Sequence, residues 1–451
     1  MTRRLVIIGG DAAGMSAAAQ ARRLAKPDAL EILAFERGEY TSYAACGLPY
    51  LVGGIVDEWA KLVARSPEEH RARGIDVRTR HEVIAIDPDA STVTVRDLES
   101  GRELTEHWDA LLIATGASGV MPPWPGADAS GVFQLRTLVD AAGVEARIAA
   151  GARRAVVVGA GYIGLEVAEN LLERGLSVTV VERLDAPMGA VLDPDMSGTV
   201  AEAMRAAGVD LRLGVSVEGF DAEGGQVRAV RTDAGAIPAD LVLVGLGVRP
   251  NVGLAREAGL RIGEAGGIVV DERLRTSLPG VWAAGDCVES RHRVSGRSVV
   301  IALGTHANRQ GRAAGTDIAG GEAAFEGVLG TAITRFGDLE IGRTGLGERE
   351  AADAGFDAFA VVTEASSRAH YYPGAQPMRI KLVAERGSGR LLGAQIVGRA
   401  ESGKRIDVLA AALWNRMSVQ EIAEMDLSYA PPFSPVWDPV LLAAGKTAAA
   451  L

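Results

Sequence analysis

AVVVGAGYIG, residues 155–164, is an apolar run that leads directly into three spaced glycines. Gly159, Gly161 and Gly164 match the G-x-G-x-x-G fingerprint, whose glycines permit a tight turn, close approach of a pyrophosphate and close helix packing. We expect a helix to about residue 172 and a second strand over 178–182, which ends in Glu182. A carboxylate at that place binds the ribose hydroxyls of a dinucleotide. The stretch therefore predicts a βαβ unit that binds a dinucleotide.

A second, less regular copy lies near the N-terminus. LVII at 5–8 is followed by GGDAAG at 9–14, a helical stretch to about 24 and a strand over 31–35 that leads to Glu36. Gly9 and Gly14 keep the first and last glycines, whereas Asp11 replaces the middle one and narrows the space for a phosphate. Two such units predict two dinucleotides, which in one chain usually means a flavin and a nicotinamide.

The choice of nicotinamide depends on the end of the second strand in the later unit. Glu182 would repel a 2′-phosphate, so NADH is favoured. Arg183 follows immediately and could turn onto a 2′-phosphate, so NADPH stays possible.

Composition narrows the class of protein. The chain has 451 residues, of which 48% are hydrophobic, enough for two or three domains with buried cofactor sites. A net charge of -11 argues against nucleic acid or an anionic membrane as the main partner. No apolar run reaches the length of a spanning helix. The two cysteines are too few for a disulfide scaffold, so we expect reduced thiols in a cytoplasmic protein. The six histidines show no ligand spacing, and no metal is expected.

The most informative chemical signal is EYTSYAACGLPY at 39–50, which holds Cys46. Residue 41 is Thr, so the C-x4-C pair of a dithiol enzyme is excluded. A thiolate at the start of a helix is stabilised by the helix dipole and is a good nucleophile. Cys46 is therefore the candidate redox centre, whereas Cys287 is expected to be an inert, buried side chain.

Two further apolar segments end in glycine, ALLIATG at 110–116 and GVWAAGD at 280–286. Together with the two glycine turns they resemble the fingerprints of the glutathione-reductase-like superfamily. The resemblance implies an α/β fold with two Rossmann-like nucleotide-binding domains and an α+β C-terminal dimerisation domain. It implies an FAD domain at 1–118 and 248–324, an NAD(P)H domain at 119–247 and a dimerisation domain at 325–451. The implied FAD ligands are Gly9, Gly14, Glu36, Thr115, Gly116 and Asp286, and those of NAD(P)H are Gly159, Gly161, Tyr162, Gly164 and Glu182.

Within the superfamily, the S-Y-x-x-C-G-L-P-Y pattern at 42–50 resembles the single-cysteine branch of coenzyme A disulfide reductases, coenzyme A persulfide reductases, NADH oxidases and NADH peroxidases. Ala12 stands where peroxidases and many water-forming oxidases carry a histidine, which favours a disulfide or persulfide substrate over oxygen or peroxide. Ala45 stands where the family commonly has Asn, which leaves the identity of the thiol open. NADH oxidase, flavin reductase for an electron-carrier protein and a non-turnover redox sensor remain as alternatives.

The resemblance also implies further site residues. HYYPG at 370–374 and LSYAPPFSP at 427–435 resemble segments that cross a homodimer, which would bring Tyr371 and Tyr429 near the partner's cysteine as acids. Ser42 would hydrogen-bond the resting sulfur, and Tyr162 would act as a gate over the flavin. Arg22 and Arg23 of the first helix are spaced to point outward from the flavin site and could bind the substrate's adenosine and phosphates. The resemblance places Gln20 and Arg23 where contacts to coenzyme A are expected.

Overall fold

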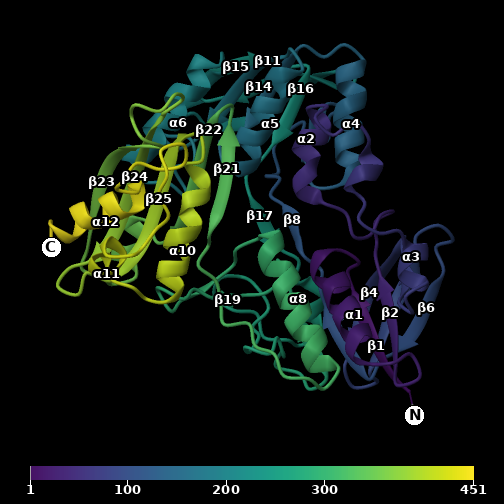
Figure 1. The fold of residues 1–451 in the computed structure, drawn as a ribbon. Coiled ribbons are helices and arrows are strands. Elements are labelled where there is room, and N and C mark those ends of the chain that lie inside the picture. Colours follow the sequence, from purple (N-terminus) through teal and green to yellow (C-terminus); the bar gives the residue numbers. More distant parts are fainter. Residues whose placement is uncertain (1) are drawn as a thin grey trace.

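The computed structural model describes residues 2–451. The first glycine turn lies at the carboxyl end of the strands of a five-stranded parallel sheet (Figure 1). Its strand order is β18-β7-β1-β2-β3. Apolar side chains fill β1, β2 and β7, because both faces of this sheet are covered. The bounds are β1 (Arg3–Ile8), β2 (Leu30–Phe35), β3 (Asp76–Arg78), β7 (Ala110–Ile113) and β18 (Val281–Ala283).

Two helices lie side by side on this sheet, α1 (Ala12–Leu24) and α8 (Gly304–Ile318) (Figure 1). Their close approach requires glycine on α8. A Cβ added to Gly311 would lie 2.2 Å from the carbonyl oxygen of Ala13. The segment that contains α8 is thereby packed tightly onto α1, although the two helices are almost 300 residues apart in sequence.

Smaller elements surround this sheet. An antiparallel sheet contains β4 (His81–Asp87), β5 (Thr92–Asp97) and β6 (Glu103–His107), and a hairpin pairs β19 (Ser290–Arg291) with β20 (Ser298–Val299). The short helices are η1 (Ala45–Gly47), α2 (Leu48–Val52), η2 (Trp59–Leu62), α3 (Pro67–Arg71) and α7 (Gly253–Glu257).

The second glycine turn belongs to a separate parallel sheet of order β12-β11-β10-β16-β9. Its strands are β9 (Val132–Phe133), β10 (Arg154–Val158), β11 (Ser177–Glu182), β12 (Asp210–Leu213) and β16 (Leu241–Val244). It is accompanied by α4 (Leu138–Ala149), α5 (Tyr162–Glu173), α6 (Pro194–Ala206) and the antiparallel strands β13 (Val217–Glu223), β14 (Gln226–Thr232) and β15 (Gly235–Pro238). The chain enters and leaves this unit through an antiparallel pair, β8 (Ala117–Gly119) and β17 (Val248–Pro250) (Figure 1).

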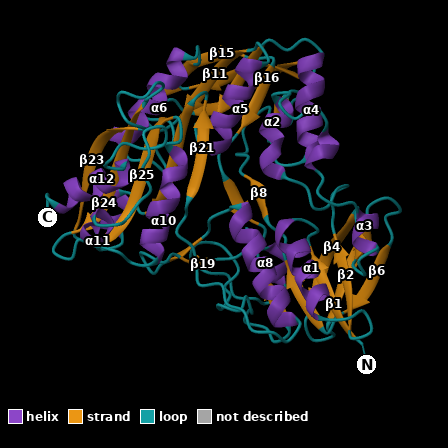
Figure 2. Cartoon of the chain, in the orientation of Figure 1, coloured by secondary structure: helices purple, strands orange, loops and turns teal. Residues whose placement is uncertain are grey.

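The C-terminal part is an antiparallel sheet of order β21-β22-β25-β24-β23 with helices beside it (Figure 2). The strands are β21 (Ala332–Phe336), β22 (Leu339–Gly345), β23 (Ala358–Ser366), β24 (Pro377–Glu385) and β25 (Leu391–Arg399). The helices are α9 (Glu348–Asp353), η3 (Gly403–Arg405), α10 (Ile406–Trp414), α11 (Val419–Ala423) and α12 (Pro439–Ala448).

The fold class expected from the sequence is confirmed: two Rossmann-like parallel sheets and an α+β C-terminal unit. The expected strands over 31–35 and 178–182 are β2 and β11, each one residue longer at its start. The domain limits at 118, 247 and 324 stay a prediction. No helix within residues 2–451 is long and apolar enough to cross a membrane.

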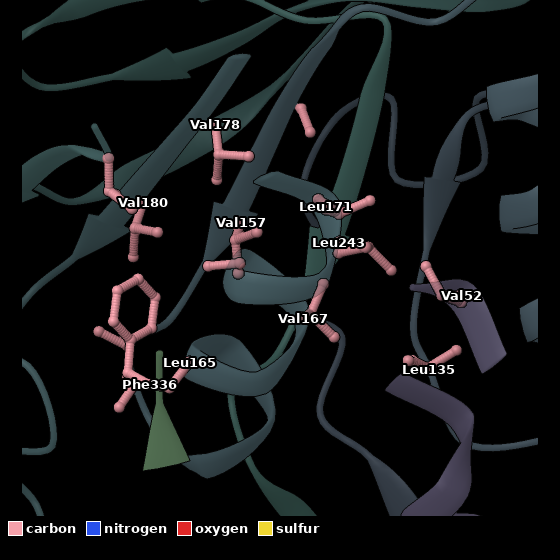
Figure 3. Packing of buried hydrophobic residues seen from close by; sticks show 14 of the residues in the cluster. Val52, Leu135, Val157, Leu165, Val167, Leu171, Val178, Val180, Leu243 and Phe336 are labelled. Carbon is pink, nitrogen blue, oxygen red and sulfur yellow. The ribbon is translucent and has the colours of Figure 1, made fainter. Parts of the chain in front are cut away.

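One apolar core joins the three units around the second sheet. Val157, Val178 and Leu243 of that sheet pack with Val52 of α2 and Phe336 of β21 (Figure 3). Because α2 directly follows Cys46, this core fixes the cysteine segment against the second nucleotide-binding unit.

Candidate active site

The first glycine turn has the geometry of a dinucleotide site. Gly9 has a φ of +110°, and a Cβ on Gly14 would lie 1.9 Å from the Gly9 carbonyl oxygen, so both positions require glycine. The Glu36 carboxylate accepts hydrogen bonds from the backbone N–H of Gly10 at 2.8 Å and of Gly38 at 2.7 Å. Glu36 is therefore held at the end of β2, beside the turn.

The second glycine turn repeats this arrangement. A Cβ on Gly164 would lie 2.0 Å from the Gly159 carbonyl oxygen, whereas the space around Gly161 is open. The Glu182 carboxylate accepts hydrogen bonds from Ala160 N–H and Leu184 N–H, both at 2.8 Å. The open space at Gly161 before the N-terminus of α5 suits a pyrophosphate. Both turns thus fit the dinucleotides that the sequence predicts.

Asp11 makes the first turn more acidic than the second. It is the N-cap residue of α1, at the position that Gly161 occupies before α5. Burial, followed by the charge of Glu36, raises the pKa of Asp11 to about 6, and Asp286 adds to the effect. The Asp11 carboxyl therefore binds a proton at a higher pH than an ordinary aspartate carboxyl does.

The residues after β7 and β18 lie at the same edge of the first sheet as the first glycine turn, because these parallel strands are neighbours of β1. Thr115 donates to the carbonyl oxygen of Asn251 at 2.7 Å, and Asn251 N–H donates to Gly116 at 2.9 Å. Asp286 lies just past β18, where burial raises the pKa of its carboxyl and Arg136 opposes this shift. Three of the six predicted FAD ligands, Thr115, Gly116 and Asp286, thus lie at the sheet edge that carries the first glycine turn.

A cavity of about 1640 Å³ joins the second glycine turn to Cys46. Its lining includes Cys46, Tyr50, Tyr162, Glu166 and Glu182, together with Arg183 and residues of α8, β21 and α10. Tyr162, the expected gate, therefore lines the same cavity as Cys46. Burial raises the pKa of Tyr162 to about 12, so its phenol stays protonated at neutral pH.

Cys46 sits in η1, the 3-10 turn immediately before α2. The end of α2 is clamped to α5, since Arg174 donates to the carbonyl oxygen of Val52 at 2.8 Å. A Cβ on Gly53 would lie 1.9 Å from the Asn170 side-chain oxygen, so the contact requires glycine. These contacts aim the cysteine into the cavity.

The electrostatics around Cys46 differ from the expectation of a helix-stabilised thiolate. Although the side chain is exposed, it is exposed into a recess, and burial by the walls raises the pKa of its thiol. The carboxylates of Glu166 and Asp286 raise it further, whereas Arg136 lowers it. The α2 helix has only five residues, so its dipole is small.

Cys287 is the expected inert thiol. It is fully buried, and its Sγ donates to the carbonyl oxygen of Ala284 at 3.3 Å. Burial raises the pKa of this thiol.

Ser42 is held close to the first glycine turn. Its φ is +52°, its backbone N–H donates to Gly10 at 3.1 Å, and its Oγ lies 2.9 Å from Nε2 of the buried His70. The expected hydrogen bond from Ser42 to the cysteine sulfur stays a prediction, because the observed partner of its hydroxyl is His70.

The two C-terminal tyrosines come together in space. Tyr371 and Tyr429 are 66% and 47% exposed, and a hydrogen bond to Tyr371 raises the pKa of the Tyr429 phenol. Ala369 N–H donates to the Pro431 carbonyl oxygen, which joins the two segments. Neither tyrosine lines the cavity of its own chain, so a role at Cys46 requires a second subunit.

Of the three residues expected to contact coenzyme A, only one has an exposed side chain. Arg22 differs from the prediction: its guanidinium donates to the carbonyl oxygens of Ala25, Leu30 and Gly74, because the C-terminal end of α1 leaves these acceptors within its reach. Gln20 is buried between α1 and α8 and donates to Thr316 at 3.0 Å, while Arg23 donates to Gln20 at 2.6 Å. Of the three, Arg23 is the exposed cation.

Sequence reasoning missed Glu166, whose carboxylate raises the pKa of Cys46 more than any other charged group does. It accepts a hydrogen bond from Thr334 Oγ1 at 3.0 Å, and burial raises its pKa. The available signal was its spacing, because Glu166 lies four residues after Tyr162 and so shares its face of α5.

A chain with two dinucleotide turns and a single cysteine between them belongs to the class of pyridine-nucleotide flavoenzymes. Residues 3–315 match the pyridine nucleotide-disulphide oxidoreductase family, and residues 331–439 match the dimerisation domain of that family. The chain belongs to this family, and it is an oxidoreductase that uses FAD and NAD(P)H.

Three comparisons illustrate the likeness. The chain is 42% identical over 447 residues to the NAD(P)H sulfur oxidoreductase (CoA-dependent) of Pyrococcus abyssi, covering 98% of this chain and 97% of that protein. It is 37% identical over 446 residues to an NADH oxidase of Methanocaldococcus jannaschii, covering 98% of each. The structure of a NAD-dependent persulfide reductase from A. fulgidus superposes with a TM-score of 0.96 at 41% identity, covering 99% of this chain and 83% of that one.

Proposed function

We propose that this enzyme reduces a small-molecule disulfide or persulfide, with coenzyme A as the best candidate for the thiol portion. The observation that carries the proposal is that Cys46 lines one cavity with the second glycine turn, while Cys287 is sealed in the core. The relatives named as a CoA-dependent sulfur oxidoreductase and a persulfide reductase support the substrate class.

The Cys46 thiolate attacks one sulfur of the substrate, so that a mixed disulfide forms and a thiolate leaves. Tyr371 or Tyr429 of the partner subunit donates a proton to the leaving thiolate. When bound, FAD supplies the means by which a hydride from NAD(P)H becomes the electron pair that reduces the mixed disulfide. The products of that reduction are a second free thiol and the regenerated Cys46 thiolate, and Ser42 hydrogen-bonds the sulfur in its resting state.

Each nucleotide has its own set of holding residues in this proposal. FAD binds Gly9, Gly14, Glu36, Thr115, Gly116 and Asp286, and NAD(P)H binds Gly159, Gly161, Tyr162, Gly164 and Glu182. Arg23 is the phosphate contact at the substrate's nucleotide end, and the buried Gln20 holds it by accepting its hydrogen bond. Arg22 contributes only indirectly, because its guanidinium is bound to backbone carbonyl oxygens. In this proposal the protein is a homodimer in the cytoplasm. The match of residues 331–439 to a dimerisation domain supports the dimer, as does the absence of Tyr371 and Tyr429 from the cavity that Cys46 lines in its own chain.

A second candidate function is NADH oxidase, which the relative of that name favours. Replacing Cys46 by Ser separates the candidates. Turnover of coenzyme A disulfide or persulfide should vanish in the variant, whereas NADH-dependent reduction of oxygen or of an electron-carrier protein should persist.

Intact mass under non-reducing conditions tests the substrate directly. We expect a reducible mass increment of one coenzyme A on Cys46 in the oxidised enzyme. A free Cys46 thiol in a fully oxidised preparation would contradict the mixed disulfide.

A further inference from the structure

We propose that Lys381 is a positioning residue for the pyridine nucleotide, because it ties one wall of the nucleotide cavity to the C-terminal sheet. The wall is the cavity loop, which we define as residues 183–193 between β11 and α6. This inference rests on the assignment of the second glycine turn to NAD(P)H, and not on the chemistry of Cys46.

Lys381 is a buried cation in the middle of β24, only 1% exposed. Its Nζ lies 3.1 Å from the carboxylate of Asp193, 2.8 Å from that of Asp195 and 2.5 Å from that of Glu348. Burial alone would lower the pKa of Lys381, but its hydrogen bonds to the three carboxylates raise it, so the ammonium stays charged. Two of these carboxylates stand at the N-terminal end of α6, in the second nucleotide-binding unit.

Asp193 is the residue through which the cavity loop is bonded to the C-terminal sheet. Its backbone N–H donates to Oε1 of Gln395 at 2.9 Å, and its carboxylate accepts from Nε2 of the same side chain at 3.0 Å. It also accepts from Glu348 N–H at 3.3 Å. Gln395 belongs to β25, which packs against α6, and α6 lies beside the C-terminal sheet (Figure 1). The end of the cavity loop is thus fastened to two strands and to α9.

The rest of the cavity loop depends on this fastening. Residues 188–191 line the cavity. Met188 has a backbone φ of +57°, which is unusual for a residue other than glycine. Its N–H donates to the Ala160 carbonyl oxygen in the glycine turn at 2.8 Å. Arg343 of β22 donates to the Val191 carbonyl oxygen at 2.9 Å. A loop held in so rare a conformation persists only where its surroundings fix it.

Charge explains why Lys381 governs the loop. Without the ammonium, the three carboxylates would lie close together with no cation among them and would repel each other, and Asp193 would be a buried charge without its cation. The exposed carboxylates, Asp195 and Glu348, can turn to water, but Asp193 is only 8% exposed and can escape only by moving the loop. That movement displaces the wall that the nucleotide contacts.

The test is calorimetric binding of NAD⁺ to the FAD-loaded dimer carrying Lys381→Met. We expect the Kd for NAD⁺ to rise ~10-fold or more, with flavin content and the alkylation rate of Cys46 within ~2-fold of the unmodified enzyme. Amide hydrogen exchange should speed up across 184–193 and stay unchanged in the first glycine turn. Arg386→Met is the matched control, because it removes a cation that lies just past the end of β24 and whose pair with Asp357 is exposed.

An unchanged Kd in a folded Lys381→Met dimer would overturn the inference, as would an equal loss of FAD and NAD⁺ binding. If that variant does not fold, Gln395→Met decides, because it removes the two hydrogen bonds to Asp193 without removing a charge. It should weaken NAD⁺ binding in the same direction and less strongly. Failure of the unmodified enzyme to turn over a disulfide would contradict the proposed function. The comparison of NAD⁺ binding would stay valid, because it does not depend on disulfide turnover.

Discussion

Cys46 and Glu166 line the same cavity, where burial and then the Glu166 carboxylate raise the pKa of the Cys46 thiol. Ionisation of the Cys46 thiol is therefore opposed by the walls of the cavity and by a neighbouring carboxylate.

The first prediction concerns this pair. Glu166→Gln removes a negative charge beside the sulfur, so the pKa of Cys46 should fall and its alkylation by iodoacetamide should speed up at a pH below that pKa. The midpoint of the rate against pH reports the shift. Glu169→Gln is the control, because Glu169 lies one turn further along α5 and is not among the groups that shift Cys46. Equal effects from both variants would show that Glu166 has no special role.

The C-terminal tyrosines provide the second prediction. Tyr429→Phe and Tyr371→Phe should each lower kcat for disulfide reduction by ~100-fold or more, because a positioned general acid typically contributes at least that much, with NADH oxidation by oxygen unchanged. Because a hydrogen bond to Tyr371 raises the pKa of Tyr429, Tyr371→Phe should also lower the Tyr429 pKa in an ultraviolet titration. Full disulfide turnover in the double variant would remove both residues from the mechanism.

The third prediction separates two glycines of the second turn. Gly164→Ala places a methyl group 2.0 Å from a carbonyl oxygen, so it should destabilise the protein by about 1–3 kcal/mol, measured by denaturant unfolding. Gly161→Ala meets open space and should leave stability unchanged while it weakens NAD⁺ binding. Tight NAD⁺ binding by the Gly161 variant would place the pyrophosphate elsewhere.

Glu182 gives the fourth prediction. Glu182→Ala should weaken NADH binding and shift the NADPH to NADH ratio of kcat/KM by ~10-fold or more toward NADPH, because it removes the carboxylate that repels a 2′-phosphate and leaves Arg183 in place. The double variant Glu182→Ala with Arg183→Ala is the control and should lose the gain. A ratio that does not change would assign ribose recognition to other residues.

The fifth prediction is a pH dependence of stability. The pKa of Asp11 is about 6 in the folded chain, above its ordinary 3.8, so the folded state binds more protons than the unfolded state between these values. Stability of the flavin-free chain should therefore fall as pH rises from 4 to 6, by at most about 3 kcal/mol from this residue. Asp11→Asn should remove that part of the decline in a series of thermal unfolding curves. A parallel decline in both proteins would contradict it.

Much of the fold and part of the site could be predicted from the sequence, because these features depend on residues that are close together in the chain. The glycine turns, the acids that close the second strands and the isolated cysteine are each set within a few tens of residues, because backbone sterics and strand-helix spacing are short-range properties. Glu36 and Glu182 lie where their spacing predicts, each accepting an N–H from its own glycine turn.

What surrounds Cys46 was decided only by the tertiary structure. Glu166 lies on α5 and Arg136 just before α4, and packing of α2 on both helices brings these side chains near the sulfur. The direction of Arg22 depends on backbone acceptors that the folded chain presents, and the burial of Lys381 depends on carboxylates more than 180 residues away. Such side chains are placed by the sum of long-range packing and desolvation, which no local pattern encodes.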